Sequence, residues 1–235
     1  MTRTALLVLL TGVCTIVLEA EPPSALVSVA ARASSAEEDL LNQFLQSDRP
    51  PLTSYRARRR LEASTLGGRM SASLEAWTYL SSNGTFGFDV IREDGSALIR
   101  DRVLWKALDT EQRSHNQRET SQIELTRANY DFRVGAATGD VVTIGLLPRR
   151  PSQMLLEGTV TVRRTDGDVV RIDGSPSVSP SWWTRHVDIV RRYARVHGIR
   201  VPVEMSSRAD VRVAGDSFFV MTYDYTMVNG RSIGE

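Results

Sequence analysis

The chain has 235 residues, of which 41% are hydrophobic and 24% charged, so its composition is that of a soluble globular protein and excludes disordered and collagen-like chains. Its 29 basic and 28 acidic side chains give a net charge of +1. Because nucleic-acid binders usually concentrate an excess of Lys and Arg, this balance argues against nucleic acid as a partner.

The first 33 residues have the pattern of a secretory signal peptide. Arg3 precedes an uncharged apolar run at residues 5–18, which is too short to cross a bilayer as a helix. Small residues suited to cleavage lie between residues 20 and 33. We therefore predict export to the periplasm and one mature domain over residues 34–235.

The only cysteine, Cys14, lies inside the apolar run of this signal. Its removal would leave a mature protein without disulfides, thiol catalysis or cysteine–zinc sites. A buried N-terminal helix and a lipidated Cys14 are the two alternatives to this interpretation.

Residues 35–46 are expected to form the first helix of the mature domain. Ser35 stands three residues before Glu38, the spacing of a capping box. The apolar side chains that share one side of this helix are Leu40, Leu41, Phe44 and Leu45. Three strands are predicted next, at residues 55–63, 71–79 and 85–92, with Asn83-Gly84 as the turn before the last.

A second amphipathic helix is predicted after Asp94-Gly95. The residues at helical spacing are Ile99, Val103, Leu104, Ala107, Leu108 and Glu111. Residues 111–122 are polar without apolar periodicity, which indicates an exposed helix end or a loop. His115, within this stretch, is expected to be a solvated surface residue.

From residue 130 to residue 228 apolar and polar side chains alternate with a period of two, the pattern of an antiparallel sheet with one solvated face. At Thr165-Asp166-Gly167 a three-residue loop keeps the apolar faces in register. It predicts Val162 opposite Val170 and Val160 opposite Ile172. His197-Gly198 and Gly215-Asp216 are expected to be the turns of the final meander.

A wide sheet with one apolar face must cover that face, and the sequence offers amphipathic helices rather than a second sheet. The predicted fold is therefore α+β: a curved antiparallel β-sheet, or incomplete β-barrel, wrapped around two or more amphipathic helices with an apolar hollow between them. A closed barrel is the alternative.

Side chains on the apolar sides of these strands are expected to line the hollow, and methionines among them can adapt to varied ligands. The predicted lining is Phe86, Phe88, Met154, Leu156, Val160, Met205, Phe219, Met221, Tyr223 and Tyr225. The alternative is that the helices fill the concave face and leave a dry core.

No sequence motif points to catalysis. A nucleophile elbow of the form G-x-S-x-G and a glycine-rich phosphate loop are both missing from the sequence. His186 and Asp188 could form a dyad or hold a metal, but without a third ligand at suitable spacing an ordinary surface pair explains them better. We predict no enzyme activity, no metal and no cofactor.

The basic clusters at residues 58–60, 149–150 and 191–192 should each be split between the two faces of the sheet, because consecutive strand residues point to opposite sides. We expect them to form a solvated rim, with a phospholipid headgroup site as the alternative. Trp182-Trp183 is expected to pack at a strand edge or to gate the mouth of a pocket.

The order of these elements resembles the LolA/LolB superfamily over residues 36–228. The resemblance rests on the aromatic segment WTYLSSNGTFGFDV at residues 77–90 and on the Leu-x-Pro stretch LLPRR at residues 146–150. Carriers of the superfamily have an Arg-Pro dipeptide before the aromatic strand, where this chain has Leu80-Ser81-Ser82-Asn83. Lipidated acceptors have an N-terminal cysteine.

The resemblance implies a half-barrel domain whose helices cover a cavity for acyl chains. The expected function is that of a periplasmic lipid or lipoprotein carrier, with a lipid or acylated protein as partner and transient contact with a membrane surface. The alternative is an RseB-like sensor or assembly factor that binds an envelope protein.

Overall fold

The structure is a computed structural model that describes residues 24–46, 50–117, 124–179, 184–212 and 215–234, with the backbone alone for residues 24–34. The chain divides into two units, Met1–Ala36 and Glu37–Glu235. Most of the predicted signal peptide and all of Trp182-Trp183 lie outside the described residues. The start of the mature domain at residue 34 stays a prediction.

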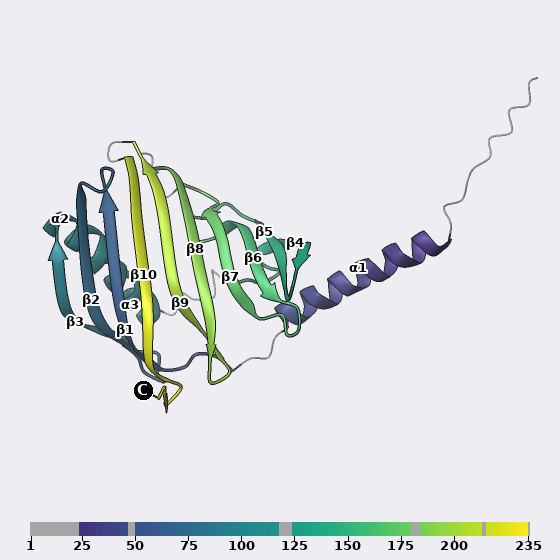
Figure 1. Ribbon diagram of the computed structural model, residues 1–235, viewed down its shortest axis with the longest axis horizontal. Helices are drawn as coiled ribbons and strands as arrows, with labels where there is room; N and C mark the ends of the chain where they lie inside the picture. Colours follow the sequence, from purple (N-terminus) through teal and green to yellow (C-terminus); the bar gives the residue numbers. More distant parts are fainter. Residues whose placement is uncertain (1–23, 47–49, 118–123, 180–183, 213–214, 235) are drawn as a thin grey trace, which may run out of the picture. The chain divides into compact units, whose positions relative to one another are not determined.

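One antiparallel sheet dominates the second unit. Its strands are β1 (Tyr55–Thr65), β2 (Met70–Leu80), β3 (Phe86–Gly95), β4 (Tyr130–Thr138), β5 (Val141–Pro148), β6 (Leu156–Arg163), β7 (Val169–Pro176), β8 (Thr184–Val196), β9 (Ile199–Val211), β10 (Gly215–Val228) and β11 (Arg231–Ser232). The order across the sheet is β3-β2-β1-β10-β9-β8-β7-β6-β5-β4, with β11 paired to β10 (Figure 1).

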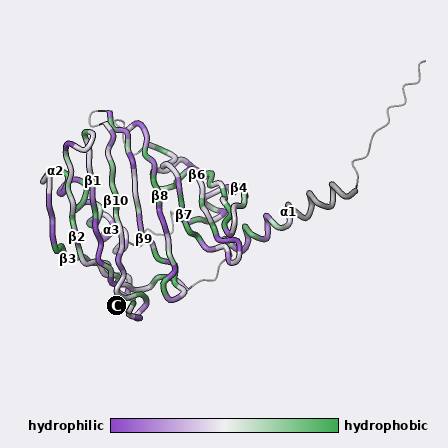
Figure 2. Tube along the Cα trace, viewed as in Figure 1, coloured by the Kyte–Doolittle hydropathy of each residue, from purple (hydrophilic) through white to green (hydrophobic). Residues whose placement is uncertain are grey.

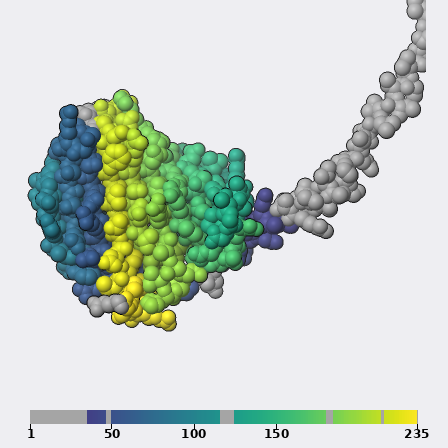
Figure 3. Space-filling view, in the orientation of Figure 1, coloured from purple at the N-terminus to yellow at the C-terminus, as the bar shows by residue number. Residues whose placement is uncertain are grey.

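The sheet is open, because β3 and β4 end this order and the described residues form no ladder between them. The predicted curved half-barrel is therefore confirmed, and the closed barrel is wrong. Hydrophobic and hydrophilic residues are interspersed along the strands (Figure 2), as expected for a sheet with one apolar and one solvated face. The view in Figure 3 shows the face turned away from the second helix, with β10 in yellow.

The first helix, α1 (Ser24–Leu45), begins eleven residues before the predicted cap at Ser35, so the capping-box prediction is wrong. Residues 24–34 contain several alanines and no Gly or Pro, so nothing in this stretch ends a helix before Ser35. The predicted apolar side is confirmed: Leu41 and Phe44 are buried against β4–β7, and Leu40 and Leu45 pack beside them.

The second helical segment is continuous from residue 97 to residue 117, as α2 (Ala97–Ile99), a π-helical turn (Arg100–Leu104) and α3 (Trp105–Gln117). Ile99, Leu104 and Leu108 are buried against Leu61 of β1 and Leu74 of β2. The predicted amphipathic helix is thus confirmed, and it packs at the β1–β3 end of the sheet, behind the strands in Figure 1.

The β6–β7 hairpin confirms one predicted pair and corrects the other. Val160 lies opposite Ile172, as predicted. Val162 lies opposite Val169 rather than Val170, because the register shifts between Thr161 and Val162. This bulge leaves Val170 without a cross-strand partner and keeps the buried valines 162 and 169 on the same face.

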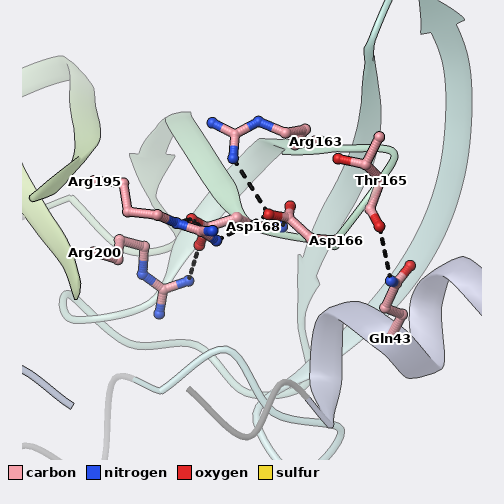
Figure 4. Close-up of polar contacts among 7 residues, drawn as sticks. All are labelled: Gln43, Arg163, Thr165, Asp166, Asp168, Arg195 and Arg200. Carbon is pink, nitrogen blue, oxygen red and sulfur yellow. Dashed lines mark hydrogen bonds and ion pairs between the residues drawn. The ribbon is translucent and has the colours of Figure 1, made fainter. Parts of the chain in front are cut away.

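Ion pairs fix the turn of this hairpin (Figure 4). Arg195 of β8 donates to Asp166 at 2.9 Å and to Asp168 at 2.7 Å, and Arg200 of β9 lies 3.5 Å from Asp168. Gln43 of α1 donates to the Thr165 carbonyl oxygen at 3.3 Å. The turn therefore anchors the end of α1 to the sheet. His197 and Gly198 form the next turn with positive φ, as predicted. Gly215 and Asp216 are the first residues of β10 and pair with Val211 and Asp210 of β9, so the predicted turn at Gly215-Asp216 is wrong.

Candidate functional site

A hollow of about 800 Å³ opens on the apolar face of the sheet, between the second helix and strands β8–β10. The helix contributes Val103, Ala107 and Thr110 to its wall, and the loop before β6 contributes Met154. The two helices cover the sheet at opposite ends, α1 over β4–β7 and the second helix over β1–β3, so the strands between them keep an uncovered strip. The expected apolar hollow is present.

Five of the ten predicted lining residues line this hollow: Met154, Met205, Phe219, Met221 and Tyr223. The other five, Phe86, Phe88, Leu156, Val160 and Tyr225, pack within the surrounding core. Phe86 and Val160 are 1% and 0% exposed, so these side chains are covered by protein. The sequence identified the apolar side of each strand but not the part of that side which the helices cover. A role in ligand binding stays a prediction for all ten.

A buried ion pair joins the second helix to the sheet beside the hollow. The guanidinium of Arg59 on β1, which is 1% exposed, donates to both carboxylate oxygens of Glu111 on α3, at 2.5 and 2.9 Å. It also donates to the Tyr55 hydroxyl and lies 4.4 Å from the centre of the Tyr223 ring. This bidentate pair fixes the position of α3 as one wall of the hollow.

Sequence reasoning placed Arg59 in a solvated rim, and the structure corrects this. The signal was present, because Arg59 shares the buried phase of β1 with Ala57 and Leu61, while Arg58 and Arg60 lie in the exposed phase. The predicted split of this cluster between the two faces is thus confirmed. Glu111 follows Leu104 and Leu108 on the buried side of the helix, so periodicity brings both charges to one interface.

The aromatic surroundings of this pair shift several ionisation equilibria. Burial raises the pKa of Tyr223 from 10.0 to about 12, although Arg59 and Arg191 act in the opposite direction. Burial also raises the pKa values of Tyr55 and Tyr225. For Arg59 burial lowers the pKa, but the hydrogen bonds to Glu111 and the nearby phenols more than offset this, so the guanidinium stays charged.

His115 is not the fully solvated residue that the sequence predicted. Its ring stacks on Phe86, with centroids 5.5 Å apart and planes 12° apart, and its Nε2 lies 3.9 Å from a carboxylate oxygen of Glu111. His115 follows Glu111 by one helical turn, so it faces the same side of α3 and forms part of the wall of the hollow.

The other sequence candidates lie on the surface. His186 Nε2 is 2.7 Å from Asp188 Oδ1, and both side chains are well exposed, as expected of a surface pair. Within the described residues no group of three or more His, Cys, Asp or Glu side chains is placed to hold a metal ion. Arg149 pairs with Asp131 at the exposed rim.

The cluster at residues 191–192 is split as predicted: Arg191 lines the hollow, whereas Arg192 is exposed and lies 3.6 Å from Glu204.

None of the helices in the described part of the chain has the length and apolar composition needed to cross a membrane.

No protein-family model matches the chain, and no match was found among curated proteins. Among solved structures, the chain is similar to a LolA superfamily protein from Nitrosomonas europaea, with a TM-score of 0.40, 9% identity, and coverage of 84% of this chain and 94% of that one. It is also similar to a DUF1329 family protein from Desulfovibrio piger, with a TM-score of 0.42, 14% identity, and coverage of 81% and 90%. We infer the function of this chain from the hollow itself.

Proposed function

We propose that the protein binds a lipid or an acylated ligand in the hollow between the second helix and strands β8–β10. The observation that carries this proposal is the hollow of about 800 Å³, since pockets of about 300–1,000 Å³ are typical of small-molecule sites. Three methionines and two aromatic residues of its wall come from the predicted set. Methionine side chains repack around ligands of varied shape, which suits flexible acyl chains.

The proposal is for binding or carriage rather than catalysis. Glu111 lies beside the hollow, where its carboxylate could act as a general base, but it is paired with Arg59 and holds α3 in place. A rigid wall of this kind supports a preformed apolar site, which lowers the cost of ordering the protein when a ligand binds. An acylated protein is the second form of ligand that such a site would accept, with only its acyl chain inside.

We further propose that the protein is exported and acts in the periplasm. Arg3 and the apolar run at residues 5–18 support this, by the signal-peptide pattern. N-terminal sequencing of protein recovered from a periplasmic fraction should give a first residue between Glu21 and Ser34. A full-length product confined to the cytoplasm would contradict export.

Two neighbouring phenylalanines on β10 test the binding site. Phe219 lines the hollow, whereas Phe218 lies on the other face and is 43% exposed. The uncharged fluorophore phenylnaphthylamine should bind the parent protein. Its affinity should fall about tenfold or more in Phe219→Ser, a loss of about 1.4 kcal/mol, and stay unchanged in Phe218→Ser.

Mass spectrometry of the native protein, purified from its own periplasm, should in addition detect a lipid that co-purifies. If the parent protein binds neither the fluorophore nor any lipid, the lipid-binding proposal fails. A role in binding an envelope protein would then have to be tested instead.

A further inference from the structure

A single row of side chains crosses the apolar face of nine strands, and one of its members is charged. Direct cross-strand pairing links each residue to the next. The row runs Val134, Ile144, Val160, Ile172, Arg191, Met205, Met221, Leu61 and Leu74. Residues paired directly across strands share a face of the sheet, so Arg191 stands among eight apolar side chains.

Arg191 occupies the strip that neither helix covers. Its cross-strand neighbour Ile172 belongs to the core beneath α1, and its other neighbour Met205 lines the hollow. Arg191 itself also lines the hollow, and its positive charge lowers the pKa of Tyr223 in the hollow and of Tyr130 in the core beneath α1, in each case against the larger effect of burial. The Arg191 side chain therefore lies on the wall of the hollow, at its boundary with the core beneath α1.

Within the described residues Arg191 forms no ion pair, and its Nε atom is buried without a hydrogen-bond acceptor. The Nε of Arg59, on the same face, is also buried without an acceptor, but the terminal nitrogens of Arg59 donate to the two carboxylate oxygens of Glu111, and Arg191 has no such carboxylate within the described residues. A buried or half-buried charge without such a partner is costly, and the cost is removed by an anion that accepts its N–H groups.

The remaining charges of the hollow also favour an anion. Arg102 and Lys106 of the second helix line it and form no ion pair within the described residues. Its two carboxylates are already engaged, Glu111 with Arg59 and Glu204 with Arg192. The hollow thus combines apolar walls with an excess of positive charge.

We propose that Arg191 binds the anionic head group of an amphiphilic ligand, a carboxylate or a phosphate monoester, whose alkyl chain lies against Met205, Phe219 and Met221. This inference rests on the proposed lipid-binding function and names the chemical class of the ligand. A guanidinium can donate two parallel hydrogen bonds to either kind of head group. The apolar neighbours then bind the chain and carry no preference for charge.

Competition experiments with ligands that differ only in the head group test this proposal. Hexadecanoic acid, hexadecyl phosphate and hexadecanol would each displace phenylnaphthylamine from the parent protein. We expect the acid and the phosphate to bind at least about tenfold more tightly than the alcohol. In Arg191→Gln this preference should disappear, so that the acid and the phosphate compete no better than the alcohol.

Arg185→Gln is the matched control, because Arg185 lies on the same strand, is exposed and pairs with Asp210 at the surface. It should keep the full preference for the anions. Arg191→Lys, which keeps the charge but not the two-pronged geometry, should keep part of it and serves as a second variant if Arg191→Gln does not fold.

Equal affinity of the parent protein for the acid, the phosphate and the alcohol would overturn the role of Arg191 and leave the lipid-binding function intact. An undiminished preference in Arg191→Gln would overturn it as well. If the phosphate alone is preferred, the head group is a phosphate monoester; if the acid alone is preferred, it is a carboxylate. Absence of binding by the fluorophore and by all three ligands would instead end the proposed function itself.

Discussion

At the scale of single residues, Arg59 and Glu111 neutralise each other's charge inside the interface between α3 and the sheet. Removing one partner of a buried pair leaves the other charge without compensation, which costs about 3–5 kcal/mol. Because the Glu111 side chain is 28% exposed, we expect Glu111→Gln to lower the free energy of unfolding by about 3 kcal/mol, the lower end of that range. Urea denaturation followed by circular dichroism would measure the change.

The surface pair of Arg60 and Glu62 supplies the control, since it lies on the same strand and its atoms are 2.6 Å apart. Exposed pairs contribute about 0–1 kcal/mol, so Glu62→Gln should change the stability by less than about 1 kcal/mol. The double variant Arg59→Met with Glu111→Leu removes both charges and should recover much of the lost stability. Equal losses in Glu111→Gln and Glu62→Gln would contradict a buried pair.

Tyr223 makes the stability of the fold depend on pH in the alkaline range. Burial raises its pKa from 10.0 to about 12 in the folded protein, so the unfolded chain loses this proton first as the pH rises. The stability that it contributes is fully present below pH 10 and is lost as the pH rises toward about 12. Denaturation at a series of pH values should show this loss, and Tyr223→Phe should reduce it; an identical profile for the variant would contradict the shift.

Sequence reasoning at this scale identified strand phases more reliably than side-chain environments. The alternation on β1 marks Arg59 as inward-facing, but a charge on an apolar face is acceptable only when a partner from elsewhere meets it. That partner, Glu111, is 52 residues away and belongs to a helix. Such a long-range pair depends on how the helix crosses the sheet, which local periodicity does not specify.

At the scale of elements, β6 and β7 pack so closely that they require glycine. Gly158 and Gly174 lie directly opposite each other, and a Cβ atom on Gly158 would fall 2.5 Å from the Cα atom of Gly174. Because the obstacle is backbone, it can yield only if the strands separate. We expect Gly158→Ala to lower the free energy of unfolding by about 1–3 kcal/mol, the usual cost of overpacking.

Gly145 on β5 is the control for this substitution. A Cβ atom there would meet nothing nearer than Arg133 atoms at 3.6 Å, which is an ordinary contact. Gly145→Ala should therefore leave thermal stability unchanged or raise it slightly, since alanine restricts the unfolded chain. Similar melting temperatures for the two variants would show that β6 and β7 can separate without cost.

The elements also show where local sequence patterns stop being sufficient. The alternation of apolar residues predicted the strands and the Val160–Ile172 pair, because a slip of one residue would turn a whole apolar set outward. It did not predict the bulge next to Val162, which changes the register after the loop. Nor did a capping pattern at Ser35 start a helix, since the preceding residues are themselves compatible with helix.

At the scale of the whole sheet, the hollow forms because the apolar face is wider than the area that the two helices cover. The helix end at Leu41 and Phe44 covers β4–β7, and the second helix covers β1–β3. The sequence predicts the apolar face and the helices, but the volume left uncovered depends on their placement. For this reason five predicted lining residues line the hollow and five are packed beneath protein.

Substitutions at two alanine positions test whether the space beneath the second helix is a hollow or a filled core. Ala107 lines the hollow, whereas Ala76 on β2 is 0% exposed and packs in the core beneath the helix. A phenyl ring at residue 107 can extend into the empty volume, so Ala107→Phe should change stability by less than about 1 kcal/mol and weaken phenylnaphthylamine binding about tenfold or more. Ala76→Phe has no such space and should cost about 1–3 kcal/mol or more through overpacking.

Melting temperatures and fluorophore titrations of the two variants measure both effects. The decisive result is the combination at residue 107, since weakened binding with unchanged stability requires that the new ring and the ligand compete for one space. If Ala107→Phe loses as much stability as Ala76→Phe, the helices fill the concave face in solution and the space between them is core. If Ala107→Phe keeps both its stability and its affinity for phenylnaphthylamine, the fluorophore binds elsewhere on the molecule.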